Sequence, residues 1–227
     1  MNYIKHIFFD LDHTLWDFET NSNLAFKKIF TKHGLAVDLE KFFNYYSAIN
    51  RNYWKLFRQE KIGKETLRYG RLKDTFELIK FEAGNDLINK LSQDYIEFLP
   101  HNNHLIEVTN ELLKYLYPKY KMHIITNGFT EVQHRKLINS GIKSYFDEII
   151  TSERVGFKKP NPKIFKYALE LIGSTPDQAI MIGDNWEADI MGAKKLGIDV
   201  IYCNFNKEPV SDSIKSISNL LALKQYF

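Results

Sequence analysis

Two aspartates, Asp10 and Asp12, directly follow the apolar run Ile7–Phe9 near the start of the chain. An ionised carboxylate is costly to bury without a partner, so we expect this pair at the carboxyl end of a strand, facing a crevice. There, one carboxylate can act as a nucleophile and the other can give and take a proton. The pair thus places a nucleophile and a proton donor beside one reacting centre.

Three further polar motifs follow in order, each at or near the end of an expected strand. They are Thr126 with Asn127, Lys159 before a proline, and Asp184 with Asp189 five residues later. Each motif alone is common in turns and loops. Together, and in this order, they predict a metal-assisted phosphoryl-transfer site.

The residue types suggest a role for each group. Asp10 would attack phosphorus and form an aspartyl-phosphate, which divides a very high barrier into two lower ones. Asp12 would protonate the departing alkoxide and later deprotonate the attacking water. An anionic nucleophile meeting an anionic phosphate needs a hard divalent cation with oxygen ligands, so Asp184 supplies the next carboxylate and Mg²⁺ is the expected ion.

The other motif residues suit the transferred phosphate. Thr126 and Asn127 lie where a strand ends and a helix begins, so a hydroxyl and backbone N–H groups there can hold phosphoryl oxygens. Lys159 adds a fixed positive charge. Asp189 could bind the metal through water or hold Lys159 in place.

Composition limits the class of protein. The chain has 227 residues, 44% of them hydrophobic, which is enough for one large domain or for a core that carries a smaller one. A net charge of +3, without a long basic stripe, argues against binding of a nucleic-acid polymer. The single cysteine, Cys203, excludes an internal disulfide and a thiolate metal site. We see no signal peptide or spanning helix and expect a cytoplasmic protein without a membrane partner.

Apolar runs typical of strands alternate with amphipathic patterns typical of helices. The expected strands are Ile4–Phe9, His123–Ile125, Asp147–Ile150, Ala179–Ile182 and Val200–Cys203. The expected helices are Leu105–Leu116, Thr130–Ser140, Pro162–Ile172 and Trp186–Leu196. This alternation predicts an α/β fold, with a parallel sheet covered on both faces by helices.

The segment from residue 16 to residue 100 does not follow this alternation of strands and helices. It contains four helical patterns and no convincing strand: Asn21–His33, Leu39–Glu60, Lys64–Lys80 and Asp86–Phe98. We therefore expect a catalytic core of residues 1–15 and 101–227 and an inserted all-helical cap of residues 16–100. Residues 211–218 are expected to be a polar surface loop that leads to a short helix at residues 219–226.

The motifs resemble those of the haloacid dehalogenase-like hydrolase superfamily. The family order is DxDxT, a Ser or Thr after a strand, a Lys and an acidic GDxxxxD, which here are DLDHT, TNG, the lysine of GFKKPNPKIF, and GDNWEAD. The resemblance implies a Rossmann-like core, Mg²⁺ dependence and an aspartyl-phosphate on Asp10. It also implies that the backbone carbonyl of Asp12 ligates Mg²⁺, and that the helical insert is a cap over the strand ends.

The residue at position 12 separates branches of this superfamily. Halide needs no protonation, and the dehalogenases lack an acid there, so Asp12 argues for phosphate chemistry. The stretch LWDFE, with TNGFT and GDNWEADI, resembles the intracellular 5′-nucleotidases that act on noncanonical nucleoside monophosphates, often pyrimidine ones. This resemblance implies hydrolysis of nucleoside 5′-monophosphates. Separately, we expect a monomer or a homodimer.

Residues outside the motifs are candidates for substrate recognition. Arg68 and Arg71 share a helical face and could reach a phosphate or a sugar hydroxyl, or could be an ordinary surface pair. Trp16 could contact the substrate or cap, or could simply pack. The aromatic residues at helical spacing in the insert favour the cap's own core over stacking on a nucleobase.

Other functions stay open at this stage. The alternatives are a phosphomutase resembling β-phosphoglucomutase, a sugar-phosphate phosphatase, and a phosphonatase that uses a cap lysine (Lys55, Lys61 or Lys64). A non-enzymatic binding protein is disfavoured because every acid and base that the chemistry needs is present.

Overall fold

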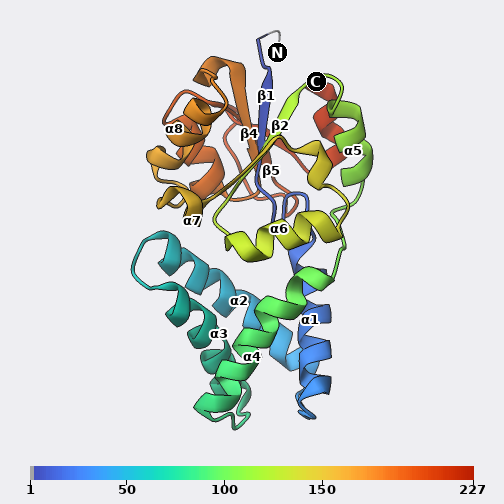
Figure 1. The fold of residues 1–227 in the computed structure, drawn as a ribbon, viewed down its shortest axis with the longest axis vertical. Coiled ribbons are helices and arrows are strands. Elements are labelled where there is room, and N and C mark those ends of the chain that lie inside the picture. The colour runs from blue at the N-terminus through green and yellow to red at the C-terminus, as the bar shows by residue number, and fades with distance from the viewer. Residues whose placement is uncertain (1–2) are drawn as a thin grey trace. The chain divides into compact units, whose positions relative to one another are not determined.

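The computed structural model describes residues 3–227, which form two compact units (Figure 1). Residues up to 18 together with residues 103–227 make one unit, called here the sheet unit. Residues 19–102 make the other, called the helical unit. The sequence-based boundaries, after residues 15 and 100, lie within three residues of these divisions.

Among residues 3–18 and 103–227, the sheet unit is built on six parallel strands in the order β3-β2-β1-β4-β5-β6. The strands are β1 (His6–Phe9), β2 (Lys121–Thr126), β3 (Glu148–Thr151), β4 (Ala179–Gly183), β5 (Asp199–Cys203) and β6 (Lys215–Ile217). The central strand β1 lies between β2 and β4, and Phe9 is level with Ile124 and Ile182. The predicted α/β fold with a parallel sheet is therefore confirmed.

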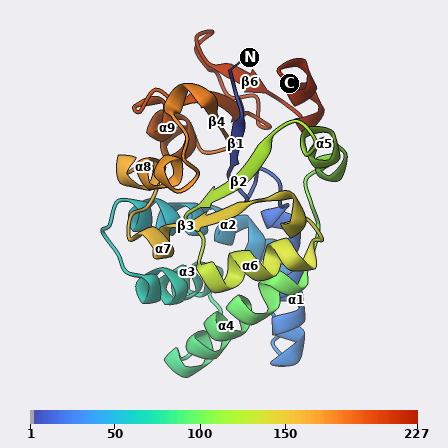
Figure 2. The ribbon, with the colours of Figure 1, turned by 45° about the horizontal axis from the view of Figure 1, so that its top comes forward.

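Helices lie on both faces of this sheet (Figures 1 and 2). The helical elements are α5 (Thr109–Leu116), α6 (Thr130–Asn139), η2 (Lys143–Tyr145), α7 (Ser152–Val155), α8 (Pro162–Leu171), η3 (Pro176–Gln178), η4 (Trp186–Met191), α9 (Gly192–Lys194) and η5 (Leu220–Gln225). Phe8 of β1 shares one buried core with Phe165 of α8 and Ala193 of α9. Alternation along the strand turns Ile7 and Phe9 to the opposite face, and α5 lies on that side (Figure 1).

Some local expectations differ from the structure. The helix expected from Leu105 begins only at Thr109. Residues 211–218 are not all loop, because Lys215–Ile217 form β6, which pairs with the end of β5. The buried side chains of Ile214 and Ile217 attach this short edge strand, while its polar residues mislead a pattern-based prediction. The helix expected from Trp186 begins as a single turn of π-helix, η4, in which the amides of Asp189 and Ile190 both donate to the carbonyl of Asn185.

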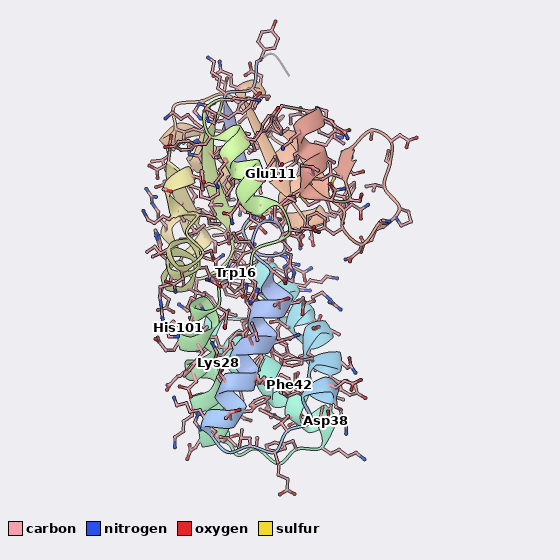
Figure 3. All side chains as sticks on the ribbon, turned by 90° about the vertical axis from the view of Figure 1, so that its right-hand side faces the viewer. Trp16, Lys28, Asp38, Phe42, His101 and Glu111 are labelled. Carbon is pink, nitrogen blue, oxygen red and sulfur yellow. The ribbon has the colours of Figure 1, made fainter. Side chains whose placement is uncertain are left out.

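The helical unit consists of four helices, as the periodicity predicts, and of one short helical turn that was not predicted. They are α1 (Phe18–Lys32), α2 (Leu39–Arg58), α3 (Lys64–Ile79), α4 (Asn85–Phe98) and η1 (Leu99–His101). Asp38, labelled in Figure 3, caps α2 by accepting a hydrogen bond from the amide of Lys41 at 3.0 Å. The ring of Phe42 is fully buried against those of Phe26 and Tyr46, so these aromatic residues form the unit's own core.

The segments that leave and re-enter the sheet unit pair with each other. Trp16 forms an antiparallel bridge with Leu105, and the amide of Asp17 donates to the carbonyl of His104 at 3.1 Å. This pairing fixes the backbone directly after the aspartate motif. Within residues 3–227, none of the helices has the length and apolar character that crossing a bilayer requires.

Candidate active site

The sheet brings the sequence motifs to a single edge. Asp10 directly follows β1 and donates its amide to the carbonyl of Ile182 in β4 at 2.9 Å. Thr126 is the last residue of β2, and Asp184 directly follows β4. Because these neighbouring strands are parallel, their carboxyl ends meet, and the polar side chains meet with them.

Lys159 lies at the centre of this edge. Its ammonium group contacts Oδ1 of Asp10 at 2.9 Å and Oδ1 of Asp189 at 2.6 Å, and it donates to the carbonyl of Ile125 at 2.6 Å. The side chain is only 2% exposed. Burial lowers the pKa of Lys159, but the two carboxylates offset this and hold its pKa above the ordinary value. The lysine is therefore a fixed positive charge beside Asp10.

Asp189 is fully buried and holds this lysine in place. Its other oxygen, Oδ2, accepts a hydrogen bond from the amide of Asn185 at 3.0 Å. A Cβ atom at Gly183 would come within 2.3 Å of that oxygen, so only glycine leaves room for the carboxylate here. Of the two roles considered for Asp189, these contacts are those of a lysine-orienting residue.

Asp184 is held by the aspartate motif itself. The Thr14 hydroxyl donates to Oδ1 of Asp184 at 3.1 Å and accepts from the backbone amide of Asp184 at 3.1 Å. One carboxylate oxygen each from Asp10, Asp184 and Asp189 lies within 4.8 Å of the others. This spacing would let a single cation contact the carboxylates of Asp10 and Asp184, while Asp189 is engaged by Lys159.

The electrostatics of this cluster favour a positive ligand. Burial raises the pKa of Asp10 to about 6 even though Lys159 opposes the shift. Burial likewise raises the pKa of Asp184 to about 6, and the charge on Asp10 adds to that shift. Both carboxylates are thus costly to ionise without a further cation, which is the condition that a metal site relieves.

Asp12 is held from helix α6 by two residues that the sequence analysis missed. Gln133 donates from Nε2 to Oδ2 of Asp12 at 3.0 Å, and Lys136 donates from Nζ to Oδ1 at 2.5 Å. Gln133 is fully buried and Lys136 is 2% exposed. Polar residues three apart on the buried face of an amphipathic helix, directly after the Thr-Asn-Gly motif, are the signal that could have found them.

Thr126 is only 2% exposed, and its hydroxyl oxygen accepts two hydrogen bonds, from the Gly128 amide at 3.0 Å and from Nε2 of Gln133 at 2.7 Å. Its own hydrogen is therefore available to a phosphoryl oxygen. The Asn127 side chain instead binds the backbone of Lys159, accepting from its amide at 2.8 Å and donating to its carbonyl at 2.9 Å. Asn127 thus holds the lysine segment against the end of β2.

Trp16 is fully buried within the sheet unit. Its indole N–H donates to the Ser140 hydroxyl at 3.1 Å, and the ammonium group of Lys136 lies 4.2 Å from its ring centroid. Of the roles considered for Trp16, these contacts agree with packing in the protein interior.

The two arginines considered for the substrate differ in exposure. Arg71 is only 2% exposed, donates to Oδ1 of Asn50 at 2.9 Å, and lies 4.8 Å from the ring centroid of Tyr95. It belongs to the interior of the helical unit, so the alternative of a surface pair is wrong for Arg71. Arg68, one turn before it on α3, is half-buried.

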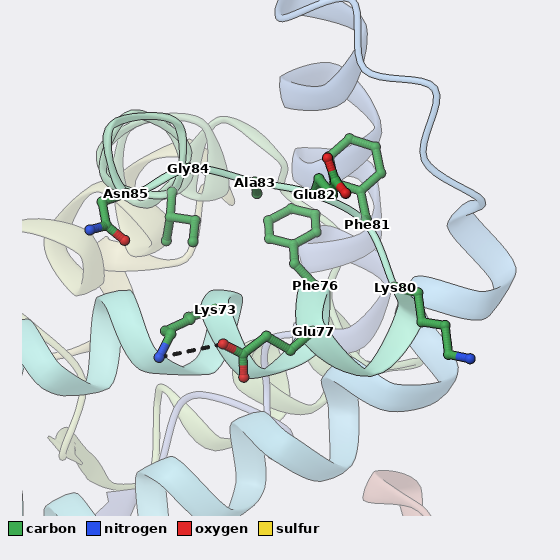
Figure 4. Close-up of a pocket in the computed structure, with 10 residues that line it drawn as sticks. Lys73, Phe76, Glu77, Lys80, Phe81, Glu82, Ala83, Gly84 and Asn85 are labelled. Carbon is green, nitrogen blue, oxygen red and sulfur yellow. Dashed lines mark ion pairs between the residues drawn. The ribbon is translucent and has the colours of Figure 1, made fainter.

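The helical unit also contains a pocket of about 720 Å³ between the end of α3 and the start of α4 (Figure 4). Phe76, Phe81 and Ile88 line it with apolar side chains, and Lys73 and Glu77 form an ion pair of 3.4 Å at its edge. None of the predicted site residues lines this pocket.

Comparison with known proteins identifies the family and a structure of similar fold. A family model described as haloacid dehalogenase-like hydrolase matches residues 7–203. The structure is similar to that of the HAD-hydrolase YfnB from Bacillus subtilis bound to magnesium, with a TM-score of 0.89, 27% identity and 98% of each chain covered.

Several curated relatives of similar length have names that state an activity. The pyrimidine 5′-nucleotidase YjjG from Escherichia coli is 32% identical over 96% of each chain. The pyrimidine 5′-nucleotidase PynA from Streptococcus pneumoniae is 31% identical, over 89% of this chain and 84% of the relative. The glyceraldehyde 3-phosphate phosphatase from Methanothermobacter thermautotrophicus is also 31% identical, over 88% of this chain and 86% of the relative.

Proposed function

Since the chain belongs to the haloacid dehalogenase-like hydrolase family, we propose that it is a Mg²⁺-dependent phosphatase of nucleoside 5′-monophosphates with pyrimidine or noncanonical bases. The family match and the relatives confirm the family resemblance. They also confirm the expectation that the chain is a phosphatase of the haloacid dehalogenase-like type. The metal, the substrate and the residue roles below are our proposal.

In the first step, a carboxylate oxygen of Asp10 attacks phosphorus and the bond from phosphorus to the ester oxygen breaks. Asp12 gives its proton to the departing alkoxide, so the nucleoside leaves as an alcohol. The ammonium group of Lys159, 2.9 Å from Asp10, and the Thr126 hydroxyl stabilise the charge on the transferred group. The product of this step is an aspartyl-phosphate on Asp10.

In the second step, Asp12, now a carboxylate, takes a proton from water while the water oxygen attacks phosphorus. The bond from phosphorus to the Asp10 oxygen breaks, inorganic phosphate leaves and the Asp10 carboxylate is restored. The same residue therefore serves as acid and then as base, which requires that it lie beside the reacting centre in both steps.

The residues fit a divalent cation. The site has four aspartates (10, 12, 184 and 189) and two lysines (136 and 159). Even with Asp12 protonated, as the first step requires, one carboxylate charge lacks a matching ammonium group. Oxygen donors of this kind suit Mg²⁺. We propose that Asp10 and Asp184 hold the ion through their carboxylates and Asp12 through its backbone carbonyl. The ion would offset the negative charge of the phosphate and of Asp10.

One observation carries the choice of phosphate chemistry, namely the position of Asp12. Its carboxylate is 22% exposed and anchored through both oxygens, two residues after the nucleophile. Displacement of a halide would need no acid here, whereas departure of an alkoxide does.

The substrate class rests on the relatives. Both nucleotidase names support a nucleoside monophosphate, while the glyceraldehyde 3-phosphate phosphatase supports a small sugar phosphate as the second candidate. Arg68 is proposed as the residue of the helical unit that contacts substrate; for Arg71 and Trp16 their contacts favour a structural role. We further propose a cytoplasmic monomer or homodimer.

The test is phosphate release from a panel of esters, with Mg²⁺ and with a chelator. The panel contains pyrimidine and purine nucleoside 5′-monophosphates, glyceraldehyde 3-phosphate and a hexose 1-phosphate, and Asp10→Asn is run beside the unaltered protein. We expect the highest kcat/KM on pyrimidine nucleotides and loss of release in the variant and in chelator. Turnover of the triose phosphate alone would favour the second candidate, and isomerisation of the hexose phosphate would favour a mutase.

A further inference from the structure

Helix α6 presents two donors to the Asp12 carboxylate, one to each oxygen. Gln133 and Lys136 lie three residues apart, so they share one face of the helix. Both are buried, which is costly for an amide and very costly for an ammonium group unless each has a partner. The Asp12 carboxylate is a shared partner, at 3.0 Å from Gln133 and 2.5 Å from Lys136.

The position of Gln133 is fixed from two further directions. Its Nε2 also donates to the Thr126 hydroxyl at 2.7 Å, which links the acid to the phosphate side of the site. A Cβ atom at residue 128 would approach the Gln133 side chain to 2.4 Å, so the glycine of the Thr-Asn-Gly motif makes room for this amide. The lack of a side chain at Gly128 therefore leaves space for Gln133 in the position from which it donates to Asp12.

The position of Lys136 is fixed by the segment that follows Asp12. Its ammonium group lies over the Trp16 ring, 4.2 Å from the centroid, a favourable cation–π geometry. The Trp16 indole donates to the Ser140 hydroxyl, which in turn donates to the Lys136 carbonyl at 2.7 Å. Trp16 and Ser140 therefore tie the lysine to the backbone that carries the acid.

We propose that Gln133 and Lys136 are positioning residues, which hold the Asp12 carboxylate in one orientation so that it delivers and takes its proton at the ester oxygen. This inference rests on the proposed phosphatase function. Each carboxylate oxygen has about two acceptor sites. One site on each oxygen is taken by α6, and the other stays available for the transferred proton.

The two buried lysines of the site thus have separate tasks. Lys159 contacts Asp10 and Asp189 and serves the transferred phosphate. Lys136 contacts Asp12 and serves the acid. Loss of Lys136 should therefore affect esters according to how much their leaving group needs a proton, and loss of Lys159 should affect all esters alike.

The experiment compares two esters that differ in the leaving group. A nucleoside 5′-monophosphate releases an alkoxide that must be protonated, whereas p-nitrophenyl phosphate releases a phenolate that departs without a proton. The variants are Lys136→Met, which shortens the side chain by one atom, and Gln133→Met, which keeps its length; both remove the donors. Lys143→Met is the control, because Lys143 is an exposed lysine just beyond the same helix.

The measured quantity is kcat/KM, since it reports the steps up to departure of the leaving group and leaves out hydrolysis of the aspartyl-phosphate. General acids contribute about 10²- to 10⁴-fold, so we expect each variant to lose roughly 10- to 100-fold on the nucleotide. The loss on p-nitrophenyl phosphate should be only a few-fold, and the control should match the unaltered protein on both esters.

Equal losses on the two esters, or no loss, would overturn the proposal, because a merely structural role does not depend on the leaving group. Circular dichroism and thermal unfolding establish that each variant is folded. If Lys136→Met does not fold, Gln133→Met alone decides, since it removes no charge. Failure of the unaltered protein to cleave any phosphate ester would instead refute the proposed function on which the inference rests.

Discussion

The substitution Lys159→Met tests the electrostatic account of the site through stability, independently of any substrate. Lys159 is 2% exposed, and its partner Asp189 is fully buried. Removing one member of a buried ion pair leaves the other as an uncompensated charge, which typically costs about 3–5 kcal/mol. For a chain of this size each kcal/mol lowers Tm by about 2–4 °C, so we expect a fall of roughly 6–20 °C.

The pH dependence of this loss has a definite sign. Burial raises the pKa of Asp189 even in the presence of Lys159, and removal of the lysine raises it further. A carboxyl whose pKa is higher in the folded than in the unfolded protein destabilises the fold increasingly as pH rises through that interval. The loss caused by Lys159→Met should therefore be larger at pH 8 than at pH 5.5.

The assay is thermal unfolding in chelator at both pH values, for Lys159→Met, Asp189→Asn and the double variant. Because Asp189→Asn removes the uncompensated carboxylate charge, the double variant should recover part of the stability lost in Lys159→Met. We expect a coupling energy of about 1–3 kcal/mol. Additive losses, or equal losses at the two pH values, would refute the idea that Lys159 and Asp189 stabilise each other as buried charges.

Three further outcomes follow from the same geometry. Asp184→Asn should raise the Mg²⁺ concentration for half-maximal activity at least about tenfold, and an unchanged metal titration would contradict the ligand role. In chelator at pH 7.5 the same variant should be more stable than the unaltered protein by up to about 3 kcal/mol, because burial raises the pKa of Asp184 to about 6 from an ordinary value near 4. That gain should shrink toward pH 5, where the carboxyl becomes protonated; a gain that grows instead would exclude this cause. Gly183→Ala should lower Tm and activity, because the new Cβ would lie within 2.3 Å of the Asp189 carboxylate. The expected loss in the free energy of unfolding is about 1–3 kcal/mol. Unchanged thermal unfolding and turnover would show that the loop shifts to make room without cost.

The parts of the site that follow strands could be predicted from sequence. Asp10, Thr126 and Asp184 stand next to buried apolar runs, and parallel strands bring their carboxyl ends together whatever the rest of the chain does. The four helices of the insert were predictable for a similar reason, because their apolar periodicity is long and uninterrupted.

The contacts made by buried polar residues could not be predicted, because their partners come from distant segments. In the sequence, Lys136 resembles an ordinary exposed lysine on a helix. In the structure it is buried against Asp12 and Trp16, which lie more than a hundred residues earlier in the chain. Arg71 likewise reads as a surface residue, but Asn50 and Tyr95 from two other helices surround it. Sequence spacing gives the face of a helix and leaves open what covers that face.

Local backbone geometry was the other missing part. His13 adopts a φ of +62°, a left-handed conformation that glycine takes without strain and that the apolar pattern around it does not indicate. The short strand β6 was missed because three residues with two polar side chains carry almost no alternation signal.

The central claim is that Asp10 carries the phosphoryl group, and acid-quenched peptide mapping tests it most directly. The protein is mixed with Mg²⁺ and a pyrimidine nucleoside 5′-monophosphate, quenched in acid within milliseconds to seconds, digested, and examined by mass spectrometry. The account predicts a transient phosphoryl adduct on Asp10, absent from Asp10→Asn. Rapid phosphate release with no adduct, or an adduct on another residue that persists in Asp10→Asn, would contradict it.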